Sequence, residues 1–181
     1  MVGSLNQLAA VAALSLSVAA CATGPSDYYG DGGYSASVSG GRIVHLTRRM
    51  ECVPYARDHS GISIRGDAYT WWDQAAGRYA RAEAPSAGAV LVIDHYAGPR
   101  RAHLAVVRSV VSDREIRVDH ANWLDDGNIY LDDPVIDVSA ANNWSEVRVF
   151  NLQTDDWGGH VYDVRGFIDP VSSPAQVAEG N

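Results

Sequence analysis

The feature that most constrains the fold is a change in pattern at Pro85, where helical segments give way to a succession of strands. The first helical segment covers residues 48–59, and a glycine stops it soon afterwards. Pro54 lies inside this segment and is tolerated only in a first turn, so the helix proper should begin close to Cys52. A second helix is expected over residues 67–76, with an aspartate at its start and a glycine at its end.

After this point the chain consists of β-branched runs separated by Gly, Asp, Asn or Pro, which is typical of strands. The expected strands cover residues 89–93, 103–111, 115–120, 135–138 and 147–152. The segment 112–114 is short enough to join two of them as a hairpin. Helices followed by consecutive strands predict an α+β fold, with the N-terminal helices packed on an antiparallel β-sheet.

The first 20 residues predict export. The stretch from Leu8 to Ala20 carries no charge, is too short to cross a membrane, and has the length of a signal-peptide apolar region. It ends in Val-Ala-Ala-Cys, which is similar to the bacterial lipobox, so we expect residues 1–20 to be a signal peptide and Cys21 to be lipidated. Ala22 favours anchoring to the outer membrane, facing the periplasm. The alternative is an ordinary signal peptide, in which Cys21 is incidental.

The rest of the chain divides by composition. Residues 21–41 are rich in Gly, Ser, Tyr and Ala and predict a flexible tether, residues 42–170 the folded domain, and residues 171–181 a disordered tail. With 46 % hydrophobic and 20 % charged residues, this is one soluble domain, expected to be a monomer. The net charge of −8 argues against nucleic acid as a partner. All basic residues are arginine, which excludes catalytic lysines.

Cys52 is the candidate nucleophile, since it stands where the first helix should begin. Unpaired N–H groups and the positive end of the helix dipole favour a thiolate there. The alternative is a buried structural cysteine. If the hairpin forms around residues 112–114, His103 and His120 lie side by side at its outer end. A cysteine facing paired histidines is the layout that nucleophilic cysteine catalysis requires.

Several motifs in this order resemble the CHAP family, cysteine amidases and peptidases that act on bacterial cell walls and are related to NlpC-type peptidases. The resemblance covers about residues 48–152 and implies a papain-like CHAP fold. It is carried by Glu51-Cys52-Val53-Pro54-Tyr55-Ala56, Gly66-Asp67-Ala68 with Trp71-Trp72, Pro85 to Val92, His103-Leu104-Ala105-Val106-Val107, and Asp119-His120-Ala121-Asn122-Trp123.

The resemblance implies roles for particular residues. Cys52 would be the nucleophile and His103 the general base. CHAP enzymes often carry an acidic group where this chain has His120, whereas NlpC-type relatives use a histidine as the third polar residue. His120 is therefore the expected third member, with Asn122 as a further polar contact. Asp119 is the competitor, but strand alternation points it to the opposite face.

Other interpretations use some of the same residues. Tyr55, Trp71, Trp72 and Trp123 are candidate substrate-binding aromatics, with simple core packing as the alternative. A zinc site from His95, His103 and His120 is a further alternative, but it lacks a close ligand spacing and leaves Cys52 unexplained. We therefore expect no metal and no cofactor.

The sequence thus predicts a peptidoglycan hydrolase that cleaves an amide bond through a thioester. The bond would be either the one between muramic acid and L-alanine or one within a stem peptide. Peptidoglycan and, through the lipid anchor, a membrane are the expected partners. The alternative is a catalytically inactive cell-wall-binding or division-regulating module on the same fold.

Overall fold

The computed structural model describes residues 40–170, so the expected signal peptide, the lipidated Cys21, most of the tether and the tail lie outside the described residues. Among residues 40–170, no helix is long and apolar enough to cross a membrane. The helices and strands are β1 (Arg42–Val44), α1 (Cys52–Ser60), the 3-10 helix η1 (Ala68–Thr70), α2 (Trp71–Ala75), β2 (Ala80–Ala82), β3 (Val90–Ile93), β4 (His103–Val110), β5 (Glu115–Ala121), β6 (Ile129–Asp137), β7 (Glu146–Asn151), β8 (Asp156–Trp157) and β9 (Tyr162–Asp169).

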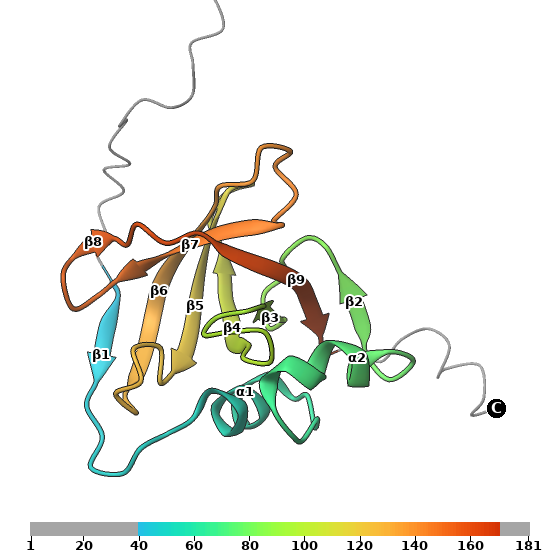
Figure 1. Ribbon diagram of the computed structural model, residues 1–181, viewed down its shortest axis with the longest axis horizontal. Coiled ribbons are helices and arrows are strands. Elements are labelled where there is room, and N and C mark those ends of the chain that lie inside the picture. The colour runs from blue at the N-terminus through green and yellow to red at the C-terminus, as the bar shows by residue number, and fades with distance from the viewer. Residues whose placement is uncertain (1–39, 171–181) are drawn as a thin grey trace, which may run out of the picture. The chain divides into compact units, whose positions relative to one another are not determined.

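Strands β3, β4, β5, β6, β7 and β9 form a closed antiparallel barrel (Figure 1). Each strand pairs with the next in this order, and β9 pairs back with β3. Strand β6 makes the closure possible because it is long enough to change partners. Its first residues pair with β1 on the outer side, and its last residues, Val135–Asp137, pair with β7.

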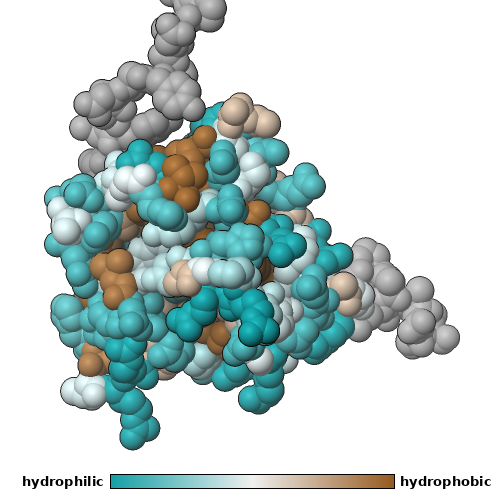
Figure 2. Space-filling view, viewed as in Figure 1, coloured by the Kyte–Doolittle hydropathy of each residue, from teal (hydrophilic) through white to brown (hydrophobic). Residues whose placement is uncertain are grey.

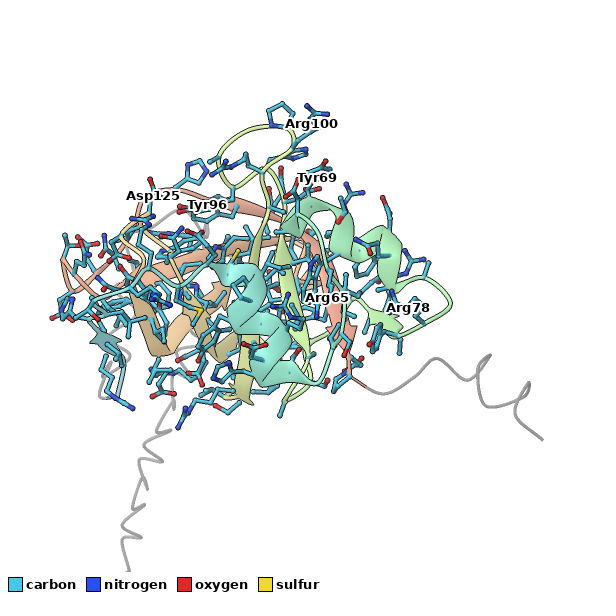
Figure 3. The ribbon with its side chains drawn as sticks, turned by 90° about the horizontal axis from the view of Figure 1, so that it is seen from below. Arg65, Tyr69, Arg78, Tyr96, Arg100 and Asp125 are labelled. Atoms are coloured by element: carbon cyan, nitrogen blue, oxygen red, sulfur yellow. The ribbon has the colours of Figure 1, made fainter. Side chains whose placement is uncertain are left out.

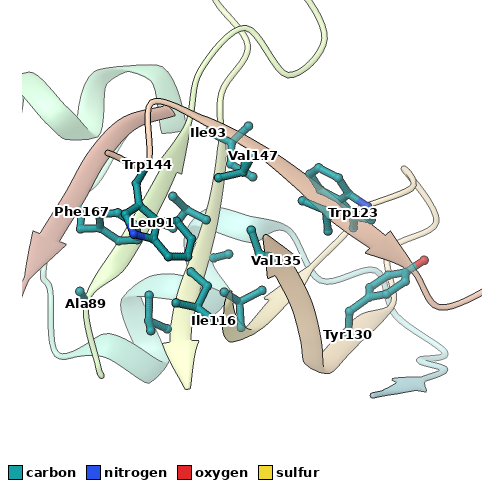
Figure 4. Close-up of a cluster of buried hydrophobic side chains, with 14 residues drawn as sticks. Ala89, Leu91, Ile93, Ile116, Trp123, Tyr130, Val135, Trp144, Val147 and Phe167 are labelled. Atoms are coloured by element: carbon teal, nitrogen blue, oxygen red, sulfur yellow. The ribbon is translucent and has the colours of Figure 1, made fainter. Parts of the chain in front are cut away.

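Two apolar layers explain why the central strands are continuous hydrophobic runs. In β3, Leu91 and Ile93 point into the barrel, whereas Val90 and Val92 point outward against the helices. Because both faces are buried, the usual alternation of apolar and polar residues disappears. Figure 4 shows the interior layer, in which Leu91 and Ile93 lie near Trp144, Val147 and other large side chains.

The predicted fold class, a papain-like α+β arrangement of N-terminal helices on an antiparallel sheet, is wrong. Over residues 40–170 the structure is mostly β, with a closed barrel and two short α-helices, α1 and α2. The sequence pattern missed β9, the strand that closes the barrel, because Asp163, Arg165 and Gly166 interrupt its apolar run. An open sheet was therefore expected where a closed one forms.

Gly166 is the point of β9 at which the barrel wall meets α2. Its φ is +138°, and a Cβ added there would lie 2.5 Å from the Trp72 ring and 2.8 Å from the carbonyl oxygen of Ala82. The register between β3 and β9 also shifts here, between Val92 and Ile93. Glycine is required at this position because the neighbouring element packs directly on the backbone.

Local predictions from the first half of the domain are confirmed. Helix α1 begins at Cys52 and ends before Gly61, which has the left-handed φ of +75°. Strands β4 and β5 form the expected hairpin, in which Ala105 lies opposite His120. Helix α1 packs against β4 and β5, and this contact brings the beginning of the helix to the end of the hairpin (Figure 1).

Candidate active site

Cys52 is the first residue of α1, and the helix start leaves backbone donors free around it. The N-cap residue Glu51 is extended and makes no capping bond with its side chain. The N–H of Tyr55 makes the first helical hydrogen bond, to the carbonyl of Glu51, and Pro54 has no N–H. The N–H groups of Cys52 and Val53 are therefore the free donors of this turn, and both are directed at the thiol.

The half-buried thiol of Cys52 is nevertheless not a thiolate at rest. Burial raises its pKa above the ordinary value of 9.0, and the carboxylate of Glu51 raises it further. Backbone N–H groups of Leu104, Val53 and Cys52 itself lower the pKa, but burial outweighs them. The helix start favours the thiolate, as expected, but burial reverses the net direction of the pKa shift.

His103 and His120 meet inside one end of the barrel. His103 lies opposite Ile93, and His120 lies opposite Ala105 and Tyr130, all of which face the barrel interior. The Nε2 atom of His103 is 2.9 Å from the Nδ1 atom of His120, and both residues are buried. Burial and the neighbouring imidazole hold the pKa of His103 well below its ordinary value of 6.5.

Asp133 extends this pair, and sequence reasoning missed it. Its Oδ2 is 2.9 Å from the Nε2 of His120, its side chain is fully buried, and its Oδ1 has no hydrogen-bond partner. A bulge in β6 directs it there. Asp132 is the inserted residue, with a φ of +56°, so Asp133 instead of Asp132 lies opposite Val118. Without that bulge, the carboxylate of Asp133 would point to the other face.

The three side chains define the tautomer of each ring. Burial raises the pKa of Asp133, whereas the hydrogen bond from His120 lowers it. In its ionised form Asp133 accepts only, so the Nε2 of His120 carries a proton and donates the hydrogen bond. The Nδ1 of a neutral His120 is then an acceptor, and the Nε2 of His103 donates to it. The Nδ1 of His103 is left unprotonated, which is the state that a general base requires.

The thiol lies close to the backbone of β4, one residue from His103. The thiol accepts from the N–H of Leu104, the residue that follows His103. Tyr96 lies beside His103, since the centroids of the two rings are 5.2 Å apart, and burial is the main cause that raises the pKa of Tyr96 to about 12. No direct hydrogen bond joins thiol and imidazole within residues 40–170, and such bonds often form only when substrate binds.

Trp123 covers the two histidines from the side. Its ring centroid lies 4.9 Å from that of His103 and 5.4 Å from that of His120. The hydroxyl of Tyr96 donates to its carbonyl oxygen. Trp123 is only 3 % exposed, so the structure places this predicted substrate-binding aromatic over the histidine pair and not on the surface.

The other predicted aromatics also lie in the core. Tyr55 and Trp71 belong to the apolar layer between α1, α2 and the barrel, and both are buried. Trp72 is half-buried, packs on Gly166 and carries the guanidinium of Arg81 on its ring. None of these three lines the cleft described below.

Asn122 and Asp119 both lie apart from the histidines. The side chain of Asn122 donates to Glu51 over 2.7 Å and accepts from Arg49 and from the N–H of Gly127, so it fixes the start of α1. Asp119 points to the opposite face, as strand alternation predicted. There it pairs with Arg108 at 3.0 Å.

The zinc alternative has no geometric support. His95 is exposed and lies 3.6 Å from the carboxylate of Asp163, away from the ring nitrogens of His103 and His120, which are engaged as described. Among residues 40–170 there is no group of three or more His, Cys, Asp or Glu side chains placed to hold a metal ion.

A cleft of about 440 Å³ opens on Cys52, a size typical of small-ligand sites. One wall is formed by the start of α1 and by residues 66–69, and the other by residues 100–102, immediately before His103. Tyr69, Tyr96 and Arg100 mark this end of the molecule in Figure 3. A ligand in the cleft therefore reaches the thiol, with the histidine pair behind it.

The family model of the CHAP domain matches residues 45–122. The resemblance inferred from the motifs is thereby confirmed over this range, in which the chain matches the CHAP domain. CHAP domains are generally hydrolytic cell-wall enzymes, which supports an activity of the peptidoglycan amidase or peptidase class. Comparisons with curated proteins and with solved structures found no match.

Proposed function

We propose that the protein is a cysteine-dependent hydrolase of peptidoglycan amide bonds. The observation that carries the proposal is the buried chain Asp133–His120–His103, whose hydrogen bonds leave the Nδ1 of His103 free to accept a proton, one residue before the Leu104 backbone that contacts the Cys52 thiol. A structural cysteine needs no such base. The family supplies the substrate class, the bacterial cell wall.

Because both thiol and imidazole are neutral at rest, proton transfer accompanies attack. The Nδ1 of His103 takes the proton of Cys52 as its sulfur bonds to the scissile carbonyl carbon. The N–H groups of Cys52 and Val53 donate to the oxyanion that forms. The imidazolium of His103 then protonates the leaving amine, and the C–N bond breaks to give a thioester. A water molecule, deprotonated by His103, attacks this thioester and releases the acid and the thiol.

His120 and Asp133 act behind the base. The Nδ1 of His120 accepts a hydrogen bond from the Nε2–H of His103 and holds the His103 ring in one orientation. Asp133 supplies the negative charge that a neutral third histidine lacks, so the imidazolium is stabilised through His120. The Asp–His arrangement of a catalytic triad is here lengthened by one imidazole.

We also propose that the enzyme acts in the periplasm, as a lipoprotein of the outer membrane. The support is the lipobox-like Val-Ala-Ala-Cys sequence that ends at Cys21. Metabolic labelling with a fatty-acid analogue should label the wild-type protein, and Cys21→Ala should lose the label. Labelling of the variant would refute the proposal.

The activity is tested by incubating purified protein with sacculi and analysing the soluble products by mass spectrometry. We expect released fragments from the wild-type protein and none from Cys52→Ala. The masses identify the cleaved bond, and thus distinguish an amidase from an endopeptidase. If the wild-type protein releases nothing beyond the Cys52→Ala control, the hydrolase proposal is wrong and a wall-binding module takes its place.

A further inference from the structure

The cleft on Cys52 has a basic wall that the proposed chemistry does not use. The loop between β3 and β4 contributes Arg100 and Arg101, both exposed, and both line the cleft together with the thiol. Figure 3 shows Arg100 at the outer edge of this loop, near Tyr69 on the facing segment. Neither step of thioester formation or hydrolysis requires a cation at this position.

Both guanidinium groups are free to bind a ligand. Within residues 40–170, neither Arg100 nor Arg101 forms an ion pair or a side-chain hydrogen bond. By contrast, Glu51 in the same cleft already accepts from Asn122. The two cations are adjacent in the chain, in a protein with a net charge of −8 whose surface in Figure 2 is mostly hydrophilic.

The wall of the cleft formed by residues 66–69 carries a negative charge. Asp67 lies at the start of η1, and its carboxylate forms no ion pair with the arginines across the cleft. An anionic group that enters the cleft is therefore repelled from this wall and attracted to the arginines. The planar donor fork of arginine matches a carboxylate in two parallel hydrogen bonds.

We propose that Arg100 and Arg101 form a carboxylate-binding subsite, so the preferred substrate is a peptide with a free carboxylate close to the cleaved amide bond. This inference rests on the proposed hydrolase function. Beyond that function, it specifies that the substrate carries a negative charge and that Arg100 and Arg101 select for this charge. The arginines bind the carboxylate, and the carbonyl to be attacked is thereby directed to the Cys52 sulfur.

The test uses two versions of one muramoyl stem peptide, which contains both candidate scissile bonds, with its carboxyl groups either free or amidated. Binding to the Cys52→Ala protein is measured by calorimetry, and hydrolysis by the wild-type protein is measured in parallel. Charged hydrogen bonds of this kind predict about 10-fold or stronger preference for the free peptide. The double variant Arg100→Gln/Arg101→Gln should lose the preference, while Arg78→Gln, which lies far from Arg100 in Figure 3, should keep it.

The outcomes separate the two proposals. Equal binding of both peptides, or an unchanged preference in the double variant with an unchanged melting temperature, would overturn the subsite. Carboxylate-selective binding without any hydrolysis would leave the subsite standing and refute the hydrolase. If neither peptide binds and neither is cleaved, both proposals fail.

Discussion

Replacing Asp133 with asparagine is the sharpest test of the buried relay. In the native protein Asp133 accepts from the Nε2 of His120, and its other oxygen is buried without a partner. The amide of Asp133→Asn has nearly the same shape but can lie in two orientations. If its oxygen takes the accepting position, its NH₂ group is buried where no acceptor exists. If its NH₂ group donates to His120, both hydrogen bonds between residues 133, 120 and 103 reverse their direction, and each histidine ring changes its tautomer.

The reversed orientation should win. A buried amide donor without a partner costs about 1–3 kcal/mol, which corresponds to roughly 5- to 150-fold in the population of the productive tautomer. In the reversed state, the Nδ1 of His103 carries a proton and does not accept one from Cys52. The negative charge of Asp133 is lost as well. For the analogous Asp→Asn change in a serine-protease triad, the fall in kcat is about 10⁴-fold, so we expect a decrease between about 10²- and 10⁴-fold.

The assay combines hydrolysis of sacculi with ¹⁵N NMR, which reports the protonated nitrogen of each histidine ring. We expect the ¹⁵N shifts of His103 to exchange between Nε2 and Nδ1 in Asp133→Asn. Asp119→Asn is the matched control, because Asp119 lies on the facing strand β5 but points away from the histidines. A folded Asp133→Asn protein with wild-type activity and unchanged histidine tautomers would refute the reasoning.

Three further predictions follow from the same structure. Burial lowers the pKa of His103, so below about pH 6.5 this residue binds a proton in the unfolded chain but not in the folded one. The free energy of unfolding should therefore decrease as the pH falls below about 6.5, by up to ~1.4 kcal/mol per pH unit. In thermal denaturation at several pH values, His103→Phe should show a weaker pH dependence. In urea unfolding, Gly166→Ala should lower the free energy of unfolding by about 1–3 kcal/mol more than Gly98→Ala. Gly98 is the matched control because its φ is also positive, +120°, but no atom lies near its Cβ position, whereas a Cβ at Gly166 meets Trp72. Equal losses of stability in the two variants would contradict this prediction. Asn122→Gly introduces a residue that tolerates the φ of +60° but removes the side-chain hydrogen bonds, so we expect a loss of about 1–3 kcal/mol of stability. The pH profile of Cys52 alkylation should stay unchanged. A shifted profile would show that Asn122 acts on the catalytic base.

The sequence by itself determined the features that depend on short stretches of chain. Pro54 restricts the helix start to Cys52, and the turn at residues 112–114 sets the distance of His103 and His120 from it. The turn thus predicted that both rings lie at the same end of the hairpin. A register shift between Val107 and Ser109, which the sequence did not indicate, places them on the same face. The order of the motifs likewise identified the family.

The tertiary structure alone decided the rest, because it depends on contacts between distant segments. Barrel closure needs β9 to pair with β3 and β7, and no local pattern indicates that pairing. A bulge of one residue turned Asp133 towards His120 and reversed the faces that strict alternation assigns. Burial, a property of the whole fold, raised the pKa of Cys52 against the effect of the helix start and enclosed the aromatic side chains that the sequence had assigned to substrate.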